Sequence, residues 1–513
     1  MARTPLAQAV EQAAARLQDE EHRTTRRGLL QGAGAAMAGA TVLGRMAAPA
    51  HAARREGPRI AVIGAGLAGL TSAYRLQQGG YTADIYEASS RVGGRCWTGR
   101  GDFDDGQIYE HGGELIDTGH KALRRLAHEL GLQLDNLLRA EARGTDMLGY
   151  FAGHRYTVDR MTADFKPVLA QMSQDVTDAG YPTLYNAYTP RGYELDQLSV
   201  YDYIERYVPG GHGSPLGALL DVAYNIEYGA ETREQSSLNM LYLIGYSSPN
   251  TFTIFGASDE KFRIHGGNDQ VPTLLASRLA AQITANTALV AIKQRADKSF
   301  KLTLQNGAGS FERVYDHVVL ALPFSILRSA VDWSQAGFND VKAMAIKEQG
   351  MGTNSKFHLQ FTSRFWNDQS CNGETYSDRG YQNTWEVTRA QDGDGGILAW
   401  YTGGDVGASL GPHDGSPEQQ AKRFLRQLEP VLPGATANWN HKVVRDYWTG
   451  YQWTKGSYSY WKMGQYTRFV GAEGDRQGNC YFAGEHTSID FQGYLNGAVD
   501  SGETAAKQVL RRI

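Results

Sequence analysis

The pattern of apolar and polar positions is most informative between residues 59 and 87, where its period changes twice. A β-branched run at 59–63 predicts a short buried strand, and the segment after it predicts a helix that ends near Gln78 at a glycine pair. Alternating positions at 82–86 predict a second strand that leads into Glu87. The order strand, helix, strand is typical of an α/β domain that binds a dinucleotide.

Two later segments contain apolar strands of the same kind. One covers 288–292, and the other covers 315–323 and ends at a proline. With the C-terminal segment they predict a discontinuous dinucleotide-binding domain made of residues 57–118, 262–324 and 474–513. The more polar and largely helical stretches between them predict a nested α+β substrate-binding domain made of residues 119–261 and 325–473, with an irregular, loop-bearing region at 363–394.

The N-terminus has the pattern of a targeting segment. Arg26 and Arg27 form a twin-arginine pair, and an Ala/Gly/Leu run follows to about Leu43. Small residues at 50–52 are typical of a cleavage site. The apolar run is short and interrupted by glycine, so it predicts no stable membrane insertion. We therefore expect residues 1–52 to be a signal peptide that directs export to the periplasm or the cell exterior.

Composition excludes some classes of partner. The net charge of −4 over 513 residues gives no reason to expect nucleic acid. The three cysteines are widely spaced, and no metal-binding spacing is present among them, so no metal site is predicted. The chain is long enough for two domains, and its oligomeric state, including a homo-oligomer, is left open.

The glycines after the first strand predict how a dinucleotide is held. Gly64, Gly66 and Gly69 have the spacing G-x-G-x-x-G. Gly64 permits the tight turn, Gly66 lets the backbone approach a pyrophosphate, and Gly69 lets the helix pack closely on the strand. The helix N-terminus directs free N–H groups at the phosphates. Glu87 lies 23 positions after Gly64, where it can accept hydrogen bonds from ribose hydroxyls.

The residues after Glu87 indicate which dinucleotide. A purely NAD-binding domain needs no second glycine pair flanked by arginines, yet 90–95 contains Arg91, Gly94 and Arg95. This extension resembles the start of the FAD-binding domain of flavin-dependent amine oxidases. The resemblance implies that both arginines face the pyrophosphate, for which their planar guanidinium groups are suited.

A second motif near the C-terminus is similar to the C-terminal motif of the same family, which includes monoamine, polyamine and L-amino acid oxidases. It contains Gly484 and Glu485, followed by Gly493, Tyr494 and Leu495 at the start of a predicted helix. The fold implied is an α/β FAD-binding Rossmann-type domain with a nested α+β substrate domain, and the cofactor implied is FAD. The resemblance places further FAD contacts at Leu67, Ala68, Ala88, Gly112, Gly113, Glu114, Val290 and Trp453.

Catalytic residues are implied by the same resemblance. Lys356 matches a family lysine that holds a water at flavin N5. Trp448 and Tyr458 match a W-x7-G-x-Y pattern whose tyrosine stands beside the flavin, and Tyr494 matches the opposite wall. The two tyrosines are expected to form an aromatic slot that guides an amine to the flavin.

Two departures from the family pattern affect cofactor and substrate. Ser457 stands where monoamine oxidases carry the cysteine that binds FAD covalently, so FAD is expected to be non-covalent. No arginine follows Gly112 and Gly113, where L-amino acid oxidases usually carry one to hold the substrate carboxylate. Arg263 is the first candidate for that role, with Lys462 or Arg468 as others. Asp117 falls where some polyamine oxidases carry an acid for a distal amine, or it is an N-cap of a helix at 118–130.

The first functional interpretation is an FAD-dependent oxidase that deaminates the primary amine of an L-amino acid, using O2 and releasing H2O2, ammonia and a 2-oxo acid. The alternative is a monoamine or diamine/polyamine oxidase that gives an aldehyde. A flavoprotein dehydrogenase of the carotene-desaturase type is disfavoured by the paired tyrosines and the lysine, as is a non-catalytic flavin-stabilised interaction protein.

Overall fold

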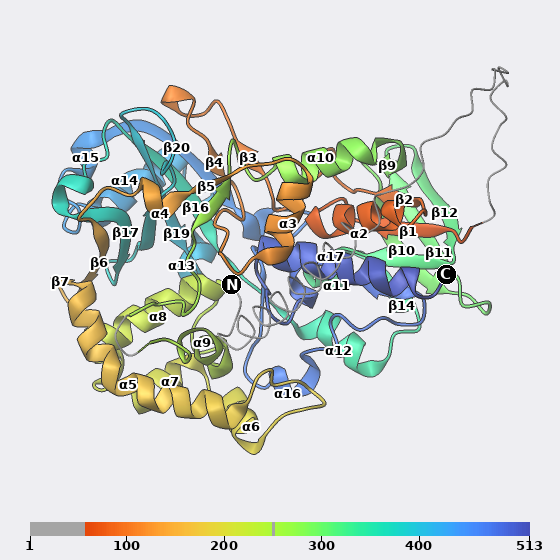
Figure 1. The fold of residues 1–513 in the computed structure, drawn as a ribbon, viewed down its shortest axis with the longest axis horizontal. Helices are drawn as coiled ribbons and strands as arrows, with labels where there is room; N and C mark the ends of the chain where they lie inside the picture. The colour runs from red at the N-terminus through yellow and green to blue at the C-terminus, as the bar shows by residue number, and fades with distance from the viewer. Residues whose placement is uncertain (1–56, 249–251) are drawn as a thin grey trace, which may run out of the picture.

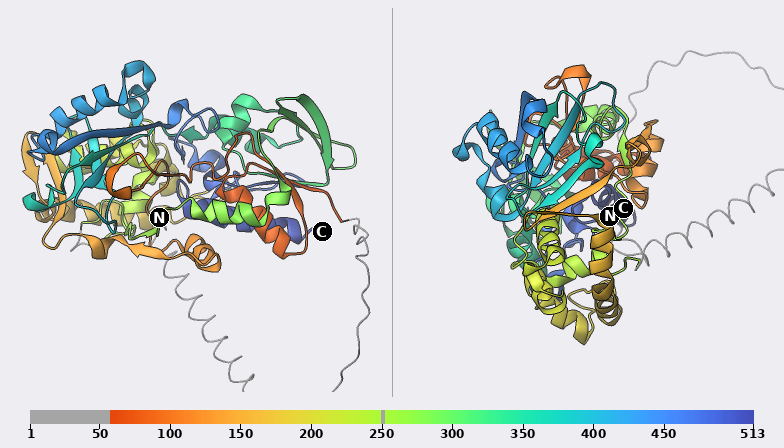
Figure 2. Two further views of the ribbon diagram at one scale, coloured as in Figure 1. Left: turned by 90° about the horizontal axis from the view of Figure 1, so that it is seen from above. Right: turned by 90° about the vertical axis from the view of Figure 1, so that its left-hand side faces the viewer.

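The computed structural model describes residues 57–248 and 252–513 (Figure 1). The expected signal peptide, with its twin-arginine pair and cleavage site, lies outside the described residues. Two lobes lie side by side along the longest axis, and each is built around its own large sheet (Figures 1 and 2).

The first lobe contains a five-stranded parallel sheet in the order β22-β13-β1-β2-β9. Its members are β1 (Ile60–Ile63), β2 (Ala83–Tyr86), β9 (Ile283–Thr284), β13 (His317–Leu320) and β22 (Cys480–Phe482). They come from the three separate segments assigned to the dinucleotide-binding domain. Helix α2 (Leu67–Gln78) connects β1 to β2 and packs on α17 (Leu495–Leu510), which confirms the strand–helix–strand order predicted at 59–87.

A smaller four-stranded sheet adjoins the first one, in the order β12-β11-β10-β14. It consists of β10 (Ala288–Gln294), β11 (Phe300–Asn306), β12 (Gly309–Tyr315) and β14 (Asp332–Gln335). The predicted strand at 288–292 therefore belongs here. The predicted strand at 315–323 is divided, because β12 ends at Tyr315 and β13 starts at His317.

The second lobe is built on a seven-stranded mixed sheet, and this corrects the expectation that 325–473 is largely helical and that 363–394 is irregular. Its order is β20-β16-β19-β18-β17-β6-β7. The strands are β6 (Asp146–Phe151), β7 (His154–Tyr156), β16 (Ser355–Phe361), β17 (Cys371–Ser377), β18 (Gln382–Glu386), β19 (Gly396–Thr402) and β20 (Trp439–Tyr447). Every residue of β16 is buried, including the polar Lys356, His358 and Gln360 that alternate with its apolar side chains.

A group of helices covers one side of this sheet, at the lower left of Figure 1. It comprises α5 (Val158–Ala179), α6 (Pro190–Asp196), α7 (Val200–Tyr207), α8 (Pro215–Tyr228) and α9 (Ser237–Ile244). Helix α8 contacts β6, β17, β18 and β19 directly. Its C-terminal end is thereby held against the sheet, beside the cavity described below.

The helix predicted at 118–130 is α3 (Lys121–Glu129), and two details differ from the expectation. Its N-cap is His120, without a side-chain capping hydrogen bond, so Asp117 is not the cap. Leu123 and Leu126 of α3 pack in the same core as β1, and α3 contacts α17, so this helix belongs to the first lobe.

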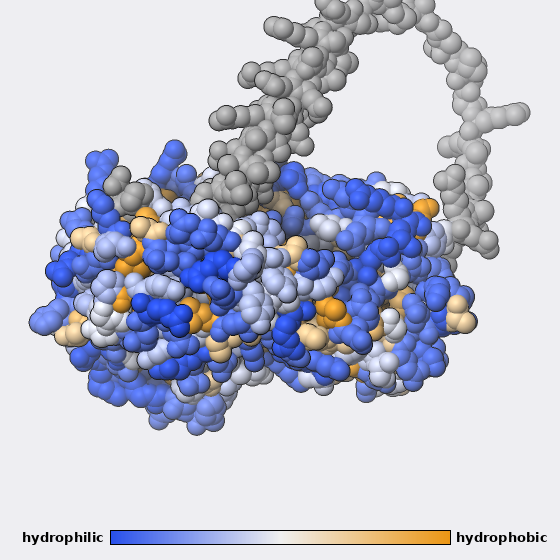
Figure 3. All heavy atoms as spheres, turned by 90° about the horizontal axis from the view of Figure 1, so that it is seen from below, coloured by the Kyte–Doolittle hydropathy of each residue, from blue (hydrophilic) through white to orange (hydrophobic). Residues whose placement is uncertain are grey.

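The remaining elements are short or peripheral. The helices are α4 (Leu137–Ala140), α10 (Gln270–Arg278), α11 (Phe324–Ala330), α12 (Asp340–Glu348), α13 (Gly404–Ser409), α14 (Pro417–Leu428), α15 (Ala435–Asn438) and α16 (Tyr466–Phe469). The strands are β3 (Thr98–Gly99), β4 (Tyr109–Glu110), β5 (Leu134–Asn136), β8 (Phe262–Ile264), β15 (Gly350–Met351) and β21 (Ser459–Tyr460). The face in Figure 3 is mainly hydrophilic with scattered apolar side chains. Within the described ranges, no helix has both the length and the apolar character that a membrane crossing needs.

Candidate active site

A cavity of about 750 Å³ is lined by residues of both lobes. Most of the residues expected to bind a cofactor or substrate line it: Gly64, Gly66, Leu67, Ala68, Glu87, Ala88, Gly94, Arg95, Gly112, Gly113, Glu114, Asp117, Val290, Lys356, Trp448, Trp453, Tyr458, Gly484, Glu485, Gly493, Tyr494 and Leu495. Three expected residues, Gly69, Arg91 and Arg263, are not part of this lining.

The glycine turn has the geometry that its spacing requires. Gly64 has a φ of +100°, a conformation that glycine adopts without strain. A Cβ on Gly69 would lie 1.9 Å from the carbonyl oxygen of Gly64, so only glycine permits this close packing. A Cβ on Gly66 would meet open space, and no side chain caps α2 at this position. The helix N-terminus therefore presents free N–H groups to the cavity.

The N-terminal and C-terminal motifs meet through an ion pair. Arg95 Nη1 donates to Glu485 Oε1 at 2.7 Å and to the carbonyl of Ser457 at 2.8 Å. Glu485 also accepts hydrogen bonds from Ser459 Oγ and from the backbone N–H of Gly493. Burial acts to raise the pKa of Glu485, but the charge of Arg95 and these hydrogen bonds hold that pKa below its ordinary value.

Arg91 has a different position from the one expected. Its guanidinium lies 4.3 Å from the ring centroid of Trp97, and Nη2 donates to the hydroxyl of Tyr451 at 3.0 Å. It packs beside the cavity wall instead of lining it, because two aromatic side chains hold its planar group. Arg95 is therefore the arginine available to a pyrophosphate.

Lys356 is part of a buried ion pair. Its Nζ lies 2.6 Å from Glu114 Oε2 and donates to the carbonyl of Glu110 at 2.9 Å. Both charged side chains are only 3% exposed. Trp385 Nε1 donates to the other oxygen of Glu114. The ion pair thus links β16 to the segment that follows Gly112 and Gly113. The water-holding role of Lys356 stays a prediction.

One end of α8 anchors both tyrosines of the expected aromatic slot. The Tyr458 hydroxyl donates to the carbonyl of Ile226 at 3.0 Å and lies 2.8 Å from the Tyr401 hydroxyl. The Tyr494 hydroxyl donates to the carboxylate of the next residue, Glu227. Burial raises the pKa of Tyr458 and of Tyr494 well above the usual tyrosine value, so both stay neutral.

Trp448 lies against Gly112, the first residue of the pair Gly112 and Gly113. Its indole N–H donates to the carbonyl of His111 at 2.9 Å, which fixes the orientation of the ring. A Cβ on Gly112 would lie 3.4 Å from this ring, so the two are in close contact. Trp448 contributes a rigid wall next to the expected flavin contacts.

Sequence reasoning missed a cluster of carboxylates in the cavity lining. We call Glu227, Glu260 and Glu374 the carboxylate cluster. Burial, together with the other carboxylates, raises the pKa of Glu260 well above its ordinary value. Burial also raises the pKa of Glu374, whose Oε1 accepts from the Tyr376 hydroxyl at 3.0 Å. The three acids come from α8, from the segment before β8 and from β17, so no local motif could reveal them.

The arginine in this part of the cavity is Arg389, not Arg263. Arg263 is 1% exposed, and its guanidinium donates to the carbonyls of Val387 and Arg389, so its expected role as a carboxylate ligand is not supported. Lys462 and Arg468 do not line the cavity either. Arg389 does line it, and its Nη1 pairs with Glu141 at 2.7 Å.

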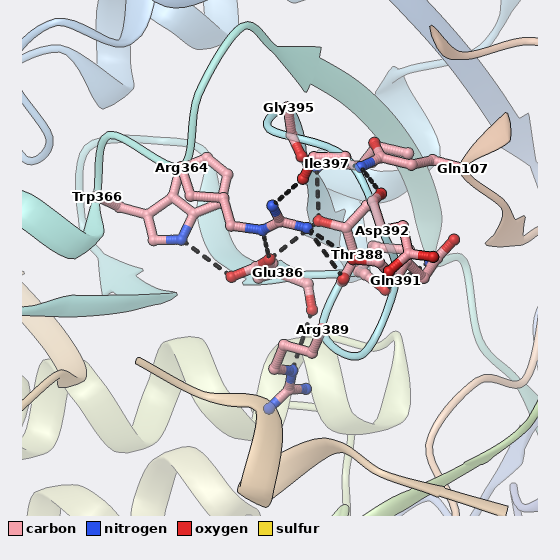
Figure 4. Close-up of polar contacts among 12 residues, drawn as sticks. Gln107, Arg364, Trp366, Glu386, Thr388, Arg389, Gln391, Asp392, Gly395 and Ile397 are labelled. Atoms are coloured by element: carbon pink, nitrogen blue, oxygen red, sulfur yellow. Dashed lines mark hydrogen bonds and ion pairs between the residues drawn. The ribbon is translucent and has the colours of Figure 1, made fainter. Parts of the chain in front are cut away.

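The loop that carries Arg389 is held by a polar network (Figure 4). Arg364 donates to the carboxylate of Glu386 and to loop carbonyls, and Trp366 donates to the same carboxylate. The carbonyl of Glu386 accepts from Arg389 Nε at 3.2 Å. This network fixes the position of the Arg389 side chain in the cavity wall. The sequence alone suggested only an irregular loop here.

Asp117 lines the cavity but is engaged by its own surroundings. Its carboxylate accepts from Ser258 Oγ at 2.9 Å and from the backbone N–H of Glu260 at 2.9 Å. It therefore supports the segment that carries Glu260, whose φ is +42°.

The strand, glycine turn and helix, joined through Arg95 to a second motif, define a dinucleotide-binding oxidoreductase. The chain belongs to the family of flavin-containing amine oxidoreductases, which matches residues 67–510. This agrees with the family resemblance seen in the sequence and with the α/β fold.

Several known proteins are similar over most of the chain. The flavin-dependent L-tryptophan oxidase RebO of Lentzea aerocolonigenes is 25% identical, covering 88% of this chain and 98% of its own. The flavin-containing amine oxidase B of Sus scrofa is 23% identical, and the match covers 88% of this chain and 86% of that protein. In fold, the chain is similar to the cyclohexylamine oxidase of Brevibacterium oxydans IH-35A, with a TM-score of 0.75 and 22% identity over 89% of this chain and 99% of the other. It is also similar to putrescine oxidase bound to putrescine, with a TM-score of 0.74 and 20% identity over 89% of this chain and 99% of the other.

FAD is the cofactor of this family, and the cavity fits it. The glycine turn leaves open space at Gly66, the N-terminus of α2 lacks a side-chain cap, and Arg95 faces the same cavity. Glu87 also lines it, although one of its oxygens accepts from the N–H of Ala65 at 2.8 Å.

FAD is expected to be released when the holoprotein is denatured. Ser457 lines the cavity and donates to Asn354 Oδ1 at 2.5 Å, and a serine forms no thioether with a flavin. Acid precipitation should leave a yellow supernatant whose absorbance accounts for one FAD per chain. Yellow colour that stays in the pellet after washing would show a covalent link.

Proposed function

We propose that this protein is an FAD-dependent oxidase of amines that carry a second positive charge, such as diamines and polyamines. It oxidises a primary amine with O2 and releases H2O2, ammonia and an aldehyde. The observation that carries the proposal is the carboxylate cluster in the cavity lining.

Electrostatics favours a cation in this part of the cavity. Burial, and after it the charge of Glu374, raises the pKa of Glu260 even beside Arg389, so charging both acids is unfavourable without a further counter-charge. A bound ammonium would supply that charge and form strong charge-assisted hydrogen bonds. A buried substrate carboxylate would add to the repulsion instead.

The cluster is arranged along the cavity. Glu227 adjoins the aromatic slot, because it binds Tyr494 and is electrostatically coupled to Tyr458. Glu260 and Glu374 are both coupled to Arg389, which pairs with Glu141. We therefore assign the reacting amine to the slot and the distal cation to Glu260 and Glu374.

The protein's own groups position the substrate for the redox step. When bound, FAD would supply the redox chemistry, which takes two electrons from the amine carbon and passes them to O2. Tyr458 and Tyr494 are fixed through their hydroxyls, so their rings form rigid, neutral walls that orient the C–H bond and exclude water. Arg95 and Glu485 join the two halves of the cofactor site.

An L-amino acid substrate is the second candidate, and it was the first interpretation from the sequence. Arg389 in the cavity and the amino-acid oxidases among the relatives favour it. Against it, the substrate carboxylate is bonded to the reacting carbon and must lie by the slot, next to Glu227. Arg389 is coupled instead to Glu260 and Glu374.

A comparison of putrescine with butylamine tests the proposal. Glu374→Gln should raise KM for putrescine about tenfold or more, because it removes a hydrogen bond to a charge worth about 1.5–3 kcal/mol. KM for butylamine, which lacks the distal amine, should change less than about twofold. Burial raises the pKa of Glu374, so this acid becomes a carboxylate only at a higher pH than usual. KM for putrescine should therefore fall as pH rises and the negative charge forms.

The measurement is peroxide release over the two amines, spermidine and the L-amino acids. Asp259→Asn is the matched control, because Asp259 lines the same cavity but is held by the backbone N–H of Thr118 at 2.8 Å. Turnover of L-amino acids with none of any diamine would reverse the order of the two candidates.

A further inference from the structure

The end of α8 lies beside the hydroxyl groups of both slot tyrosines and carries a carboxylate there. The carbonyl of Ile226 binds the Tyr458 hydroxyl, and the carboxylate of the next residue, Glu227, binds the Tyr494 hydroxyl. One helical turn thus touches both walls of the slot. Glu227 lines the same cavity as the two rings.

Amine oxidation requires loss of a proton first. An ammonium group has no lone pair with which to stabilise the positive charge that develops as hydrogen and two electrons leave the neighbouring carbon. With an alkylammonium pKa near 10.4, only about one amine molecule in 2,500 is neutral at pH 7. A proton acceptor in the slot would let the enzyme use the abundant form.

The other basic groups near the slot are unsuited to accept this proton. His486 lines the cavity, but burial lowers its pKa to about 3. Lys356 is paired with Glu114, and Asp117 accepts hydrogen bonds from Ser258 and from the backbone of the following segment. Tyr458 and Tyr494 are held in their neutral form.

We propose that Glu227 is a catalytic residue that binds the substrate ammonium in the slot and takes its proton. The N–H bond breaks and its electron pair stays on nitrogen, while an O–H bond forms on the Glu227 carboxylate. The products are a neutral amine and a protonated Glu227, so charge balances without a co-reactant. The inference needs only an amine substrate, and it holds whether or not that substrate carries a second charge.

The surroundings of Glu227 favour this transfer. In a cavity with little water, an ammonium–carboxylate pair loses solvation, and moving the proton leaves two neutral groups. The titratable groups whose pKa the charge of Glu227 raises include Tyr224, Glu260, Tyr376, Tyr401, Tyr458 and Tyr494. Glu260 is a carboxyl group of this set, and burial, with the charge of Glu227 among the lesser causes, raises the pKa of Glu260.

Proton counting on the wild-type holoenzyme gives the first test. The probe is tert-butylamine, which cannot be oxidised because its nitrogen-bearing carbon has no hydrogen. Calorimetric titration at pH 7.5 in buffers of different ionisation enthalpy should show about zero protons released per amine bound, because the proton stays on Glu227. Release of about one proton to the buffer would overturn the proposal without any variant.

The second test compares pH profiles of flavin reduction by the amine that is turned over fastest. Wild-type kcat/KM should be nearly flat from pH 7 to 9. Glu227→Gln, which keeps an oxygen for the Tyr494 hydroxyl, should lose about 100-fold or more at pH 7. Its kcat/KM should then rise about tenfold per pH unit, because only the neutral amine in solution reacts.

A structural role for Glu227 predicts a different result. In that case, the loss in Glu227→Gln would be the same at every pH, which would contradict the proposal. Asp259→Asn, the same chemical change at another cavity carboxylate, should keep the flat profile. FAD content and reoxidation of the reduced enzyme by O2 should be equal in wild type and Glu227→Gln.

Discussion

Arg95→Met is expected to purify with little FAD. Arg95 joins the two cofactor motifs by binding Glu485 and the carbonyl of Ser457, and it lines the cavity that the pyrophosphate enters. Truncating one partner of a buried charge pair costs about 2–5 kcal/mol. The Kd for FAD should therefore rise at least about 30-fold, as measured by fluorescence titration of the apoprotein.

Arg91→Met is the matched control for this experiment. The family resemblance suggested equal roles for the two arginines, but Arg91 packs against Trp97 and Tyr451 and does not line the cavity. Its replacement should change the Kd for FAD less than about threefold, since no contact with the cofactor is lost. Equal weakening in both variants would mean that the two arginines share the pyrophosphate.

The second large effect is expected from Lys356→Met. This change leaves the carboxylate of Glu114 buried without its cation, and breaking a buried pair in this way costs about 3–5 kcal/mol. The free energy of unfolding of the holoprotein should fall by about that amount. We also expect a slower flavin half-reaction, most plainly reoxidation by O2, because a buried cation next to the cofactor site is lost.

The double variant Lys356→Met/Glu114→Gln separates the two effects. Removing both charges should recover most of the lost stability, since the amide that replaces the Glu114 carboxylate is neutral and leaves no buried charge unpaired. If Lys356 acts on the flavin chemistry, stopped-flow reoxidation should stay slow in the double variant. Full recovery of both stability and rate would assign Lys356 a purely structural role.

The cofactor half of the site could be predicted from sequence because its residues lie in contiguous motifs. The spacing of Gly64, Gly66 and Gly69 is set by backbone geometry within a single turn, so it leaves the same signature in the sequence. Arg95 and Glu485 were likewise identified in two separate motifs, although nothing in the sequence indicates their ion pair.

The substrate half was predicted far less well. Strand β19 was mistaken for part of a helical stretch because it is buried on both faces and lacks alternation. Strands β17 and β18 lie in a segment whose Asn, Gly, Asp and Tyr residues suggested an irregular loop. Glu227, Glu260 and Glu374 are isolated in the sequence, and they form a cluster only because α8 packs on the seven-stranded sheet. Arg263 was chosen as the carboxylate ligand because it lies just before Gly266 and Gly267, and Arg389 was not among the candidates.

By itself, the sequence determined the FAD-binding fold and the family, since contiguous motifs carry both. The family resemblance also pointed to Tyr458 and Tyr494, and both line the cavity. Only the tertiary structure showed that Arg389, not Arg263, reaches the substrate part of the cavity, where it is paired with Glu141. It also showed that Glu227, Glu260 and Glu374 line that part of the cavity. Charges separated by more than a hundred residues interact through space, and their distances depend on how the two lobes pack.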